Sequence, residues 1–375
     1  MNKLLLLSFL VLFSCNSVYN QNTELTSIKY QTIDTNSHAS EGGLARISNN
    51  KIIVVYRKDP SFAHVSNNSE IVAKISNDNG KHWGEEKKVY NSAYDDRNLI
   101  VGNLPNGNII IVFRRYNAET NLAVDSGYII SSDGGITWNN YTKIHGTENN
   151  KNQPFGAIVN TKKESSFLIC FKKGIVKKYT SIDNFKSLPI EATIINDSTK
   201  IIQEPFLVEI AKGKQIILCR NGYGKLGQSS FYQYNSDGQN YYYKGETNIF
   251  DDEKTSVRSP VSMRYDKKSN MLEVCSTSRI FSHTTKNINN ELRFYYQNAD
   301  SVFNNPKAYQ LKIRAERPLP NKHWFYGYPK FLNISEKEVL YIVTDSRLNQ
   351  KEIKPLTHMN NEQANLYFFN NKKYE

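Results

Sequence analysis

The amino-acid sequence predicts an all-β fold, a six-bladed β-propeller, from two observations. The first is composition: 24 Tyr and 18 Phe stand among short runs rich in Val and Ile, which Asn, Gly, Asp and Ser interrupt. The second is a repeat of strand-like runs, each preceded by a polar turn, that begin at Ile52, Ile109, Phe167, Ile216, Leu272 and Val339. Their spacing of roughly fifty to sixty residues, with several short strands in each unit, is typical of propeller blades.

A recurring turn supports the repeat. "SNDNGKHW" (residues 76–83) and "SSDGGITW" (residues 131–138) follow apolar strands, and weaker copies begin at Ser181, Asn235 and Asn298. The Asp side chain can bond the backbone of its own turn, Gly supplies a positive φ, and Trp packs beneath the hairpin. We therefore expect a structural role for these turns between the outer strands of a blade, and no chemistry.

The first residues predict export. "MNKLLLLSFLVLFSC" has a Lys and then an apolar run that is too short to span a bilayer comfortably. It resembles a bacterial lipoprotein signal over residues 1–15, with Cys15 as the lipidated residue, and a plain secretory signal is the alternative. We expect a tether over residues 16–25 and one propeller over 26–375. The lipid anchor would place the protein at the outer membrane, in the periplasm or at the cell surface. We also expect a monomer.

Net charge limits the classes of ligand, and the cysteine and histidine content limits the covalent and metal sites. The net charge of +12 favours an anionic saccharide, with solvated lysines as the alternative, and no nucleic-acid motif accompanies the basic blocks. Cys170, Cys219 and Cys275 are too far apart for a zinc site, and their odd number predicts no disulfide framework, so we expect them buried. The seven His lack metal-ligand spacing, and we expect neither a metal nor another cofactor.

The residues just before each repeated strand pair are where function can be read. In a propeller the first strand of each blade lines the central axis, and the loop before it opens at one mouth. Pro follows several of these positions because a strand start tolerates it, while the residue before it varies. The positions are Glu41, Asn98, Gln153, Glu204, Ser259 and Tyr328.

The two turns and the six phased strand pairs resemble the Asp-box (BNR-repeat) propellers, above all the sialidase or neuraminidase superfamily, over roughly residues 25–370. "QEPFLVEIAKGKQIILCR" is similar to the family's Glu segment, and "YGYPKFL" to its Tyr segment. The resemblance implies an exo-acting glycosidase for a terminal acidic sugar, with Tyr328 as the nucleophile and Glu204 as its base. A neutral phenol avoids the repulsion that a carboxylate nucleophile would meet.

The resemblance also implies an arginine triad that binds a carboxylate, because guanidinium groups bind carboxylates bidentately. The preferred residues are Arg57, Arg97 and Arg220, followed by Arg279, with Arg258 and Gln153 in the loops and Arg114, Lys172 and Arg347 at other strand ends. The sequence departs from the family at the first blade, which lacks Phe-Arg-Ile-Pro. "ARIS" at Ala45 lies too close to the turn at Asn49 to replace it. This departure leaves sialic acid itself open as the substrate.

Three residues are candidates for the general acid. The family has an Asp in the loop after the first blade's inner strand, where this sequence has "YRKDPSFAHVSNNSE". His titrates near neutrality, and "YDDRN" supplies Asp96 from the next blade. His64 and Asp96 rank slightly above Asp59, because Arg57 with His64 before an Asp box, followed by "DDRN", resembles a sialidase-like subgroup of exported bacterial propellers. Two other functions stay open: a non-catalytic glycan-binding propeller, and a polysaccharide lyase that uses Tyr328 or His64 as a base.

Overall fold

The computed structural model describes residues 25–26, 30–149, 151–172, 174–222, 230–250, 259–277, 280–281, 288–289, 291–316, 324–336, 338–348 and 361–372. The predicted signal over residues 1–15, with Cys15, lies outside these residues, as does all but the last residue of the predicted tether. Two predicted site residues, Arg258 and Arg279, also lie outside them.

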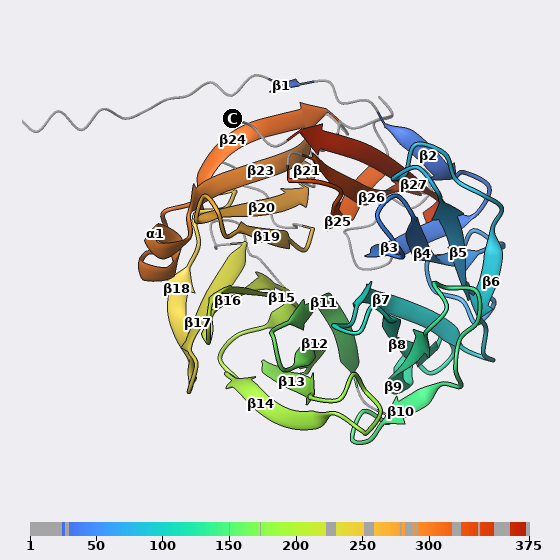
Figure 1. Cartoon of the computed structure of the whole chain (residues 1–375), viewed down its shortest axis with the longest axis horizontal. Coiled ribbons are helices and arrows are strands. Elements are labelled where there is room, and N and C mark those ends of the chain that lie inside the picture. Colours follow the sequence, from blue (N-terminus) through green and yellow to red (C-terminus); the bar gives the residue numbers. More distant parts are fainter. Residues whose placement is uncertain are drawn as a thin grey trace, which may run out of the picture.

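The chain is an all-β propeller, as predicted. Six inner strands surround the centre, each contacting the next, and the last contacts the first (Figure 1). They are β3 (His38–Arg46), β7 (Asp95–Asn103), β11 (Asn152–Asn160), β15 (Ile202–Ala211), β19 (Ser262–Asp266) and β25 (Trp324–Asn333). Residues from distant parts of the sequence are therefore brought together around one centre.

Each inner strand pairs antiparallel with a second strand at a position where the repeat predicts one. These second strands are β4 (Ile52–Asp59), β8 (Ile109–Asn117), β12 (Ser165–Phe171), β16 (Lys214–Asn221), β20 (Met271–Thr277) and β26 (Glu338–Leu348). Further antiparallel strands lie outward: β5 (Glu70–Ser76), β6 (Lys87–Tyr90), β9 (Leu122–Ser131), β10 (Thr142–Ile144), β13 (Ile175–Ser181), β14 (Ile190–Asn196), β17 (Phe231–Asp237), β18 (Tyr241–Glu246), β23 (Glu291–Asn298) and β24 (Gln310–Glu316).

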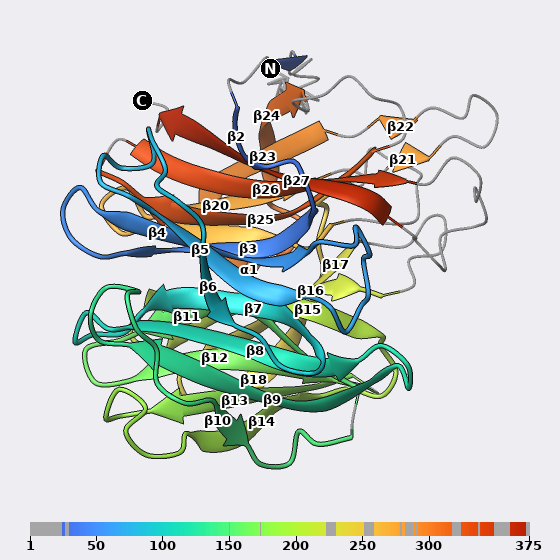
Figure 2. The ribbon, with the colours of Figure 1, turned by 90° about the vertical axis from the view of Figure 1, so that its right-hand side faces the viewer.

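The predicted number of six blades is wrong: these strands form five blade sheets. One of them has eight strands, because β27 (Asn361–Lys372) pairs antiparallel with β26 and parallel with β3 through Ala364 and His38. The early strand β2 (Gln31–Asp34) also pairs with β27, so both ends of the chain join this sheet (Figure 2). A repeat of apolar runs predicts the strands but not this pairing at the closure.

Four short elements complete the described chain. The strand β1 (Leu25–Thr26) pairs parallel with β24, and β21 (Ile280–Phe281) pairs with β22 (Ile288–Asn289). The weak turn predicted at Asn298 is wrong, because a helix, α1 (Ala299–Asn304), begins there. The Asn298 side chain accepts the backbone N–H groups of Asp300 and Ser301, which is N-capping chemistry. No helix in the described part of the chain is long and apolar enough to cross a membrane.

The turn at residues 131–138 is held by its own side chains. The Ser131 hydroxyl donates to the Asp133 carboxylate at 2.8 Å and accepts the Gly135 N–H at 2.8 Å. The same carboxylate accepts the Thr137 N–H at 2.9 Å. Gly135 has a φ of +86°, and a Cβ there would lie 2.5 Å from Ile53, so Gly fits this position for both reasons. These contacts are local and carry no reactive group.

The core lies between neighbouring blades. Ile100 and Val112 of one blade pack with Phe167 and Ile169 of the next, and similar clusters join the other blades. The expectation for the cysteines is confirmed: Cys170, Cys219 and Cys275 are free thiols and fully buried or nearly so.

Candidate active site

Four inner strands carry a non-glycine residue in the left-handed region, each at a break in strand register. The residues are Glu41 (φ 55°), Asn98 (φ 59°), Glu204 (φ 47°) and Tyr328 (φ 55°). Such a conformation costs on the order of 1–3 kcal/mol for a residue with a side chain, and it concentrates at functional sites. The sequence placed all four positions just before a strand pair, but the structure places them inside the inner strands. The bulges therefore set equivalent residues of four inner strands around the centre of the ring.

Arg97 and Glu41 form an ion pair between β7 and β3. The Arg97 Nη2 atom donates to Glu41 Oε1 at 3.0 Å, and the Asn98 backbone N–H donates to the other carboxylate oxygen. Burial alone would raise the pKa of Glu41, but Arg97 and, to a smaller extent, Arg57 hold that pKa below its ordinary value. Glu41 is therefore a fixed carboxylate that orients Arg97.

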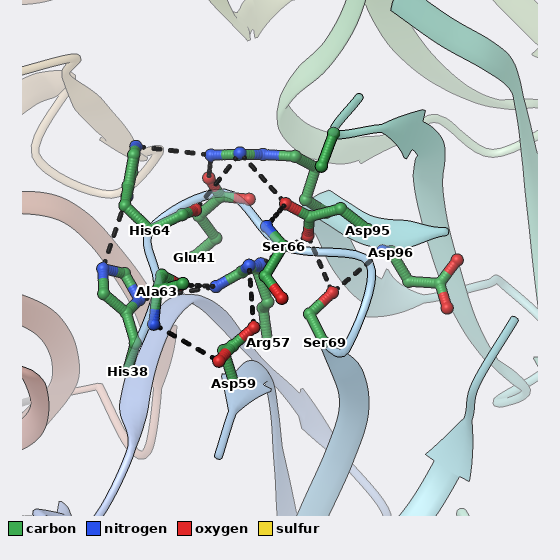
Figure 3. Close-up of polar contacts among 12 residues, drawn as sticks. His38, Glu41, Arg57, Asp59, Ala63, His64, Ser66, Ser69, Asp95 and Asp96 are labelled. Atoms are coloured by element: carbon green, nitrogen blue, oxygen red, sulfur yellow. Dashed lines mark hydrogen bonds and ion pairs between the residues drawn. The ribbon is translucent and has the colours of Figure 1, made fainter. Parts of the chain in front are cut away.

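Arg57 is completely buried and is held by acidic groups (Figure 3). Its Nε donates to Asp95 at 2.7 Å, and its Nη2 lies 3.8 Å from Asp59. Asp95 also accepts from Arg97 at 3.3 Å and from the Ser69 hydroxyl at 2.7 Å. The structure thus brings Arg57 and Arg97 together as the sequence suggests, but it places Arg57 beneath the site, where its charge is already balanced.

Arg114, which the sequence left outside the preferred triad, has no carboxylate within ion-pairing distance among the described residues. Its Nη1 donates to the Asn152 carbonyl at 2.7 Å, and its guanidinium lies 4.6 Å from the centre of the Tyr116 ring. Burial and then the nearby Arg97 charge lower the pKa of Arg114 to about 10. Arg114 could have been predicted as a site residue from its position at the end of a second strand, which it shares with Arg57 and Arg220.

Glu204 and Arg220 meet across β15 and β16. The Arg220 Nε pairs with the buried Glu204 carboxylate, and Arg220 Nη2 donates to Gln203 Oε1 at 2.8 Å. The register of the two strands places Gln203 opposite Arg220. Two predicted site residues are therefore in contact. Gln153, also predicted, lies partly buried on the neighbouring inner strand β11.

Lys330 is a buried cation that sequence reasoning missed. Its Nζ donates to the Gly156 carbonyl at 2.8 Å and lies 3.9 Å from the centre of the Phe155 ring. Burial lowers the pKa of Lys330 to about 7, although the carboxylates of Glu204 and Glu41 act in the opposite direction. The Lys330 ammonium group therefore lies within electrostatic range of both carboxylates.

Tyr328 lies two residues before Lys330 on β25 and is partly exposed. Its backbone N–H donates to the Ser259 hydroxyl at 3.1 Å, and its ring centre lies 6.3 Å from that of Phe155. Burial alone would lower the pKa of Arg97, but Glu41, Asp95 and, more weakly, the Tyr328 phenol raise it. A negative charge on the Tyr328 oxygen would therefore lie within electrostatic range of the Arg97 cation.

Of the three acid candidates, only His64 contacts the arginines from a partly exposed position. Its Nε2 lies 3.5 Å from Arg97 Nη2. The buried Asp59 carboxylate instead accepts the Ser61 N–H at 2.8 Å and the Ser61 hydroxyl at 2.5 Å, within its own loop.

Asp96 points away from Arg57 in Figure 3 and accepts the Ser92 N–H and hydroxyl, both at 2.8 Å. Burial raises the pKa of Asp96 to about 7. This carboxyl group is therefore perturbed, but the alternation of side chains along β7 turns it away from the face that Asp95 shares with the arginines. Among the described residues, no three His, Cys, Asp or Glu side chains are gathered so that they could hold a metal ion.

No protein-family model matches the chain, and no curated protein matches it. Solved structures do share its fold. A protein of unknown function from Dyadobacter fermentans superposes with a TM-score of 0.70 at 16% identity, covering 92% of this chain and 98% of that one.

Two sialidase structures are also similar. A leech intramolecular trans-sialidase complexed with 2,7-anhydro-Neu5Ac has a TM-score of 0.64 at 11% identity, covering 94% of this chain and 70% of that one. The NanB sialidase from Streptococcus pneumoniae has a TM-score of 0.60 at 12% identity, covering 93% of this chain and 70% of that one. At these identities the likeness shows a sialidase-like propeller fold and no more.

Proposed function

We propose that the protein is an exo-acting glycoside hydrolase of sialidase type, which removes a terminal acidic sugar from a glycan or polysaccharide. The observation that carries the proposal is the placement of Tyr328 and Glu204 in the same strained conformation on two inner strands of one ring. The fold is shared with sialidases, one of them complexed with a sialic-acid derivative, which supports this class of substrate. Residues 1–15 predict that the substrate is met outside the cytoplasm.

In the proposed reaction the Tyr328 phenol oxygen bonds to the anomeric carbon as the glycosidic C–O bond breaks. Glu204 accepts the phenol proton, and the leaving oxygen takes a proton from water, which becomes hydroxide, while His64 donates a hydrogen bond to that oxygen. A second water molecule then attacks the anomeric carbon and breaks its bond to Tyr328. Glu204 returns its proton to the phenol oxygen, and the hydroxide takes the proton that the attacking water loses. Arg220, paired with Glu204, keeps that carboxylate in place between the two steps.

The acidic group of the sugar would bind at Arg114 and Arg97. The guanidinium groups of Arg57, Arg97 and Arg220 each lie within ion-pairing distance of a carboxylate of the protein, whereas Arg114 has no such partner among the described side chains. A carboxylate of the substrate would supply that partner. Because Arg114 is partly buried, salt would screen the interaction less than it screens a fully exposed ion pair, and a bidentate contact would be strongly directional.

Removal of the Arg114 guanidinium should therefore weaken substrate binding. Arg114→Ala is expected to raise KM for an acidic aryl glycoside about 10- to 100-fold, since a charge-assisted hydrogen bond contributes roughly 1.5–3 kcal/mol. The matched control is Arg115→Ala, because Arg115 is the next residue on β8 but bonds Asp125 at 2.8 Å. Steady-state kinetics with both variants is the measurement. An unchanged KM in Arg114→Ala would contradict the role of Arg114 in binding the acidic group of the substrate.

A polysaccharide lyase is the second candidate, because His64 lies beside Arg97. A lyase needs a cation that neutralises the uronate carboxylate and a base that removes the adjacent carbon-bound proton. Screening the purified protein against acidic and neutral aryl glycosides and acidic oligosaccharides separates the candidates. The hydrolase releases phenol from acidic glycosides, and a lyase would instead form an unsaturated product that absorbs ultraviolet light. Binding without turnover would indicate a non-catalytic glycan-binding propeller.

A further inference from the structure

His38 and His64 form an imidazole pair between two arginines (Figure 3). The Arg57 Nη1 atom lies 3.4 Å from His38 Nδ1, and His38 Nε2 lies 3.3 Å from His64 Nδ1. At the other end, His64 Nε2 lies 3.5 Å from Arg97 Nη2. The nitrogen atoms of the four side chains thus form one row in the order Arg57, His38, His64 and Arg97. Of these four residues, His64 is the one that is partly exposed.

The two arginines restrict where the protons of this row can be. An arginine only donates hydrogen bonds, and a neutral imidazole has one N–H and one bare nitrogen. With both rings neutral, two arrangements allow a bond between them. Either both protons are on Nε2, so that His38 accepts from Arg57 and donates to His64, or both are on Nδ1. The first arrangement leaves the His64 N–H opposite Arg97, and the second leaves the His38 N–H opposite Arg57.

Burial decides between these arrangements. His38 and Arg57 are both completely buried, and Arg57 Nη1 also lies 3.4 Å from the Ala63 carbonyl. A His38 N–H that faced Arg57 there would therefore have neither water nor Arg57 as an acceptor. An unsatisfied buried donor costs about 1–3 kcal/mol. His64 is partly exposed, and Arg97 already donates to Glu41 at 3.0 Å. The mismatch is therefore cheaper at the His64 end, where the N–H can reach water or a substrate oxygen.

We propose that Arg57 and His38 are positioning residues that hold His64 neutral, with its proton on Nε2, so that His64 presents a hydrogen-bond donor to a substrate oxygen. The inference deepens the proposed function and rests on it for the identity of that oxygen. In the hydrolase the natural acceptor is the leaving oxygen. A His64 with Nε2 protonated cannot take a proton from carbon through that atom, so the tautomer disfavours His64 as a lyase base.

The charges around the pair also keep it neutral. The groups that face it are Arg57 and Arg97, with the acids Glu41, Asp95 and Asp59 bound to those arginines. Burial, then the neighbouring His64, Arg57 and Arg97, lower the pKa of His38 well below its ordinary value, and Glu41 offsets this only in part. Protonating His64 at Nδ1 would place a second N–H against the His38 N–H.

The test is ¹⁵N NMR of the histidines in the wild-type full-length protein, which requires no substrate. We expect His64 to show a protonated Nε2, a bare Nδ1 and no titration between pH 5 and 8. His82 and His145 are the internal controls, because both are exposed and each lies near one carboxylate, Asp78 or Glu148. Their ¹⁵N shifts in the same spectra give the reference for histidines outside this row. A His64 that gains a second proton in this pH range, or that holds its proton on Nδ1, overturns the inference.

Two variants at His38 test the positioning role. His38→Gln keeps an N–H donor near the place of Nε2, whereas His38→Leu removes it. His64 should gain a second proton at a higher pH in His38→Leu than in His38→Gln, because Leu has no N–H to oppose a proton on His64 Nδ1. Equal behaviour of the two folded variants would contradict the role of His38. Should His38→Leu not fold, the wild-type titration and His38→Gln still decide. The NMR experiments need no substrate. A failure of the proposed function, which turnover measurements test, can therefore be told apart from a failure of this inference.

Discussion

Tyr328→Phe is expected to lower turnover of an acidic aryl glycoside on the order of 10³-fold or more, because it removes the proposed nucleophilic oxygen and keeps the ring. The Phe155 contact, at 6.3 Å between ring centres, and the backbone bond to Ser259 do not involve the phenol oxygen. We therefore expect folding and substrate binding to persist. The measurement is kcat with each substrate that the wild type turns over.

Tyr116→Phe is the matched control for this variant. Tyr116 also lies beside the arginines, with its ring under Arg114, and its hydroxyl contacts Asn121 at 3.3 Å. Loss of that hydroxyl should leave kcat within about threefold, since it removes one exposed, neutral hydrogen bond. Retention of wild-type turnover in Tyr328→Phe, or an equal loss in both variants, would contradict the role of Tyr328.

Asp95→Ala is expected to destabilise the protein by about 3–5 kcal/mol, because it leaves the buried Arg57 without its nearest counter-charge. Burial alone would raise the pKa of Asp95, but Arg57 and Arg97 hold that pKa well below its ordinary value, so a full negative charge is present at neutral pH. Urea unfolding of wild type and variant gives the difference in the free energy of unfolding.

Asp96→Asn is the control at the next position. Burial raises the pKa of Asp96 to about 7, so its charge is only partly present at neutral pH, and Asn retains an oxygen for the Ser92 bonds. The free energy of unfolding should therefore change by less than about 1 kcal/mol. The double variant Arg57→Met with Asp95→Leu should recover part of the stability, because neither charge is then buried alone. A loss in Asp95→Ala no larger than in Asp96→Asn would refute the account of this pair.

Strand positions were predictable from the sequence because apolar runs recur with a steady spacing. Each of the six runs that begin between Ile52 and Val339 forms a second strand. The closure of the ring was not predictable from the repeat. It depends on the pairing of Ala364 with His38, near opposite ends of the chain, and the spacing of the apolar runs gives no information about this pairing. At Asn298 the sequence predicts a turn, but the Asn298 side chain caps the N-terminus of a short helix instead.

The candidate site was predictable where the blade repeat exposes equivalent positions, as at Glu204 and Tyr328. It was not predictable where charge balance decides the role of a residue. Arg57 and Arg114 end equivalent strands, yet Asp95 binds the former and the latter lacks such a partner among the described residues. His38 was missed because its importance arises from the nitrogens of Arg57 and His64 on either side of it.

Trapping of a covalent intermediate tests the central claim most directly. The probe is an acidic glycosyl fluoride that carries a second fluorine beside the anomeric carbon and belongs to a sugar that the wild type turns over. Mass spectrometry of the digested protein should find the sugar attached to the peptide at Tyr328, and no adduct in Tyr328→Phe. An adduct on Glu204, or continued turnover with no adduct at any residue, would contradict the proposed mechanism.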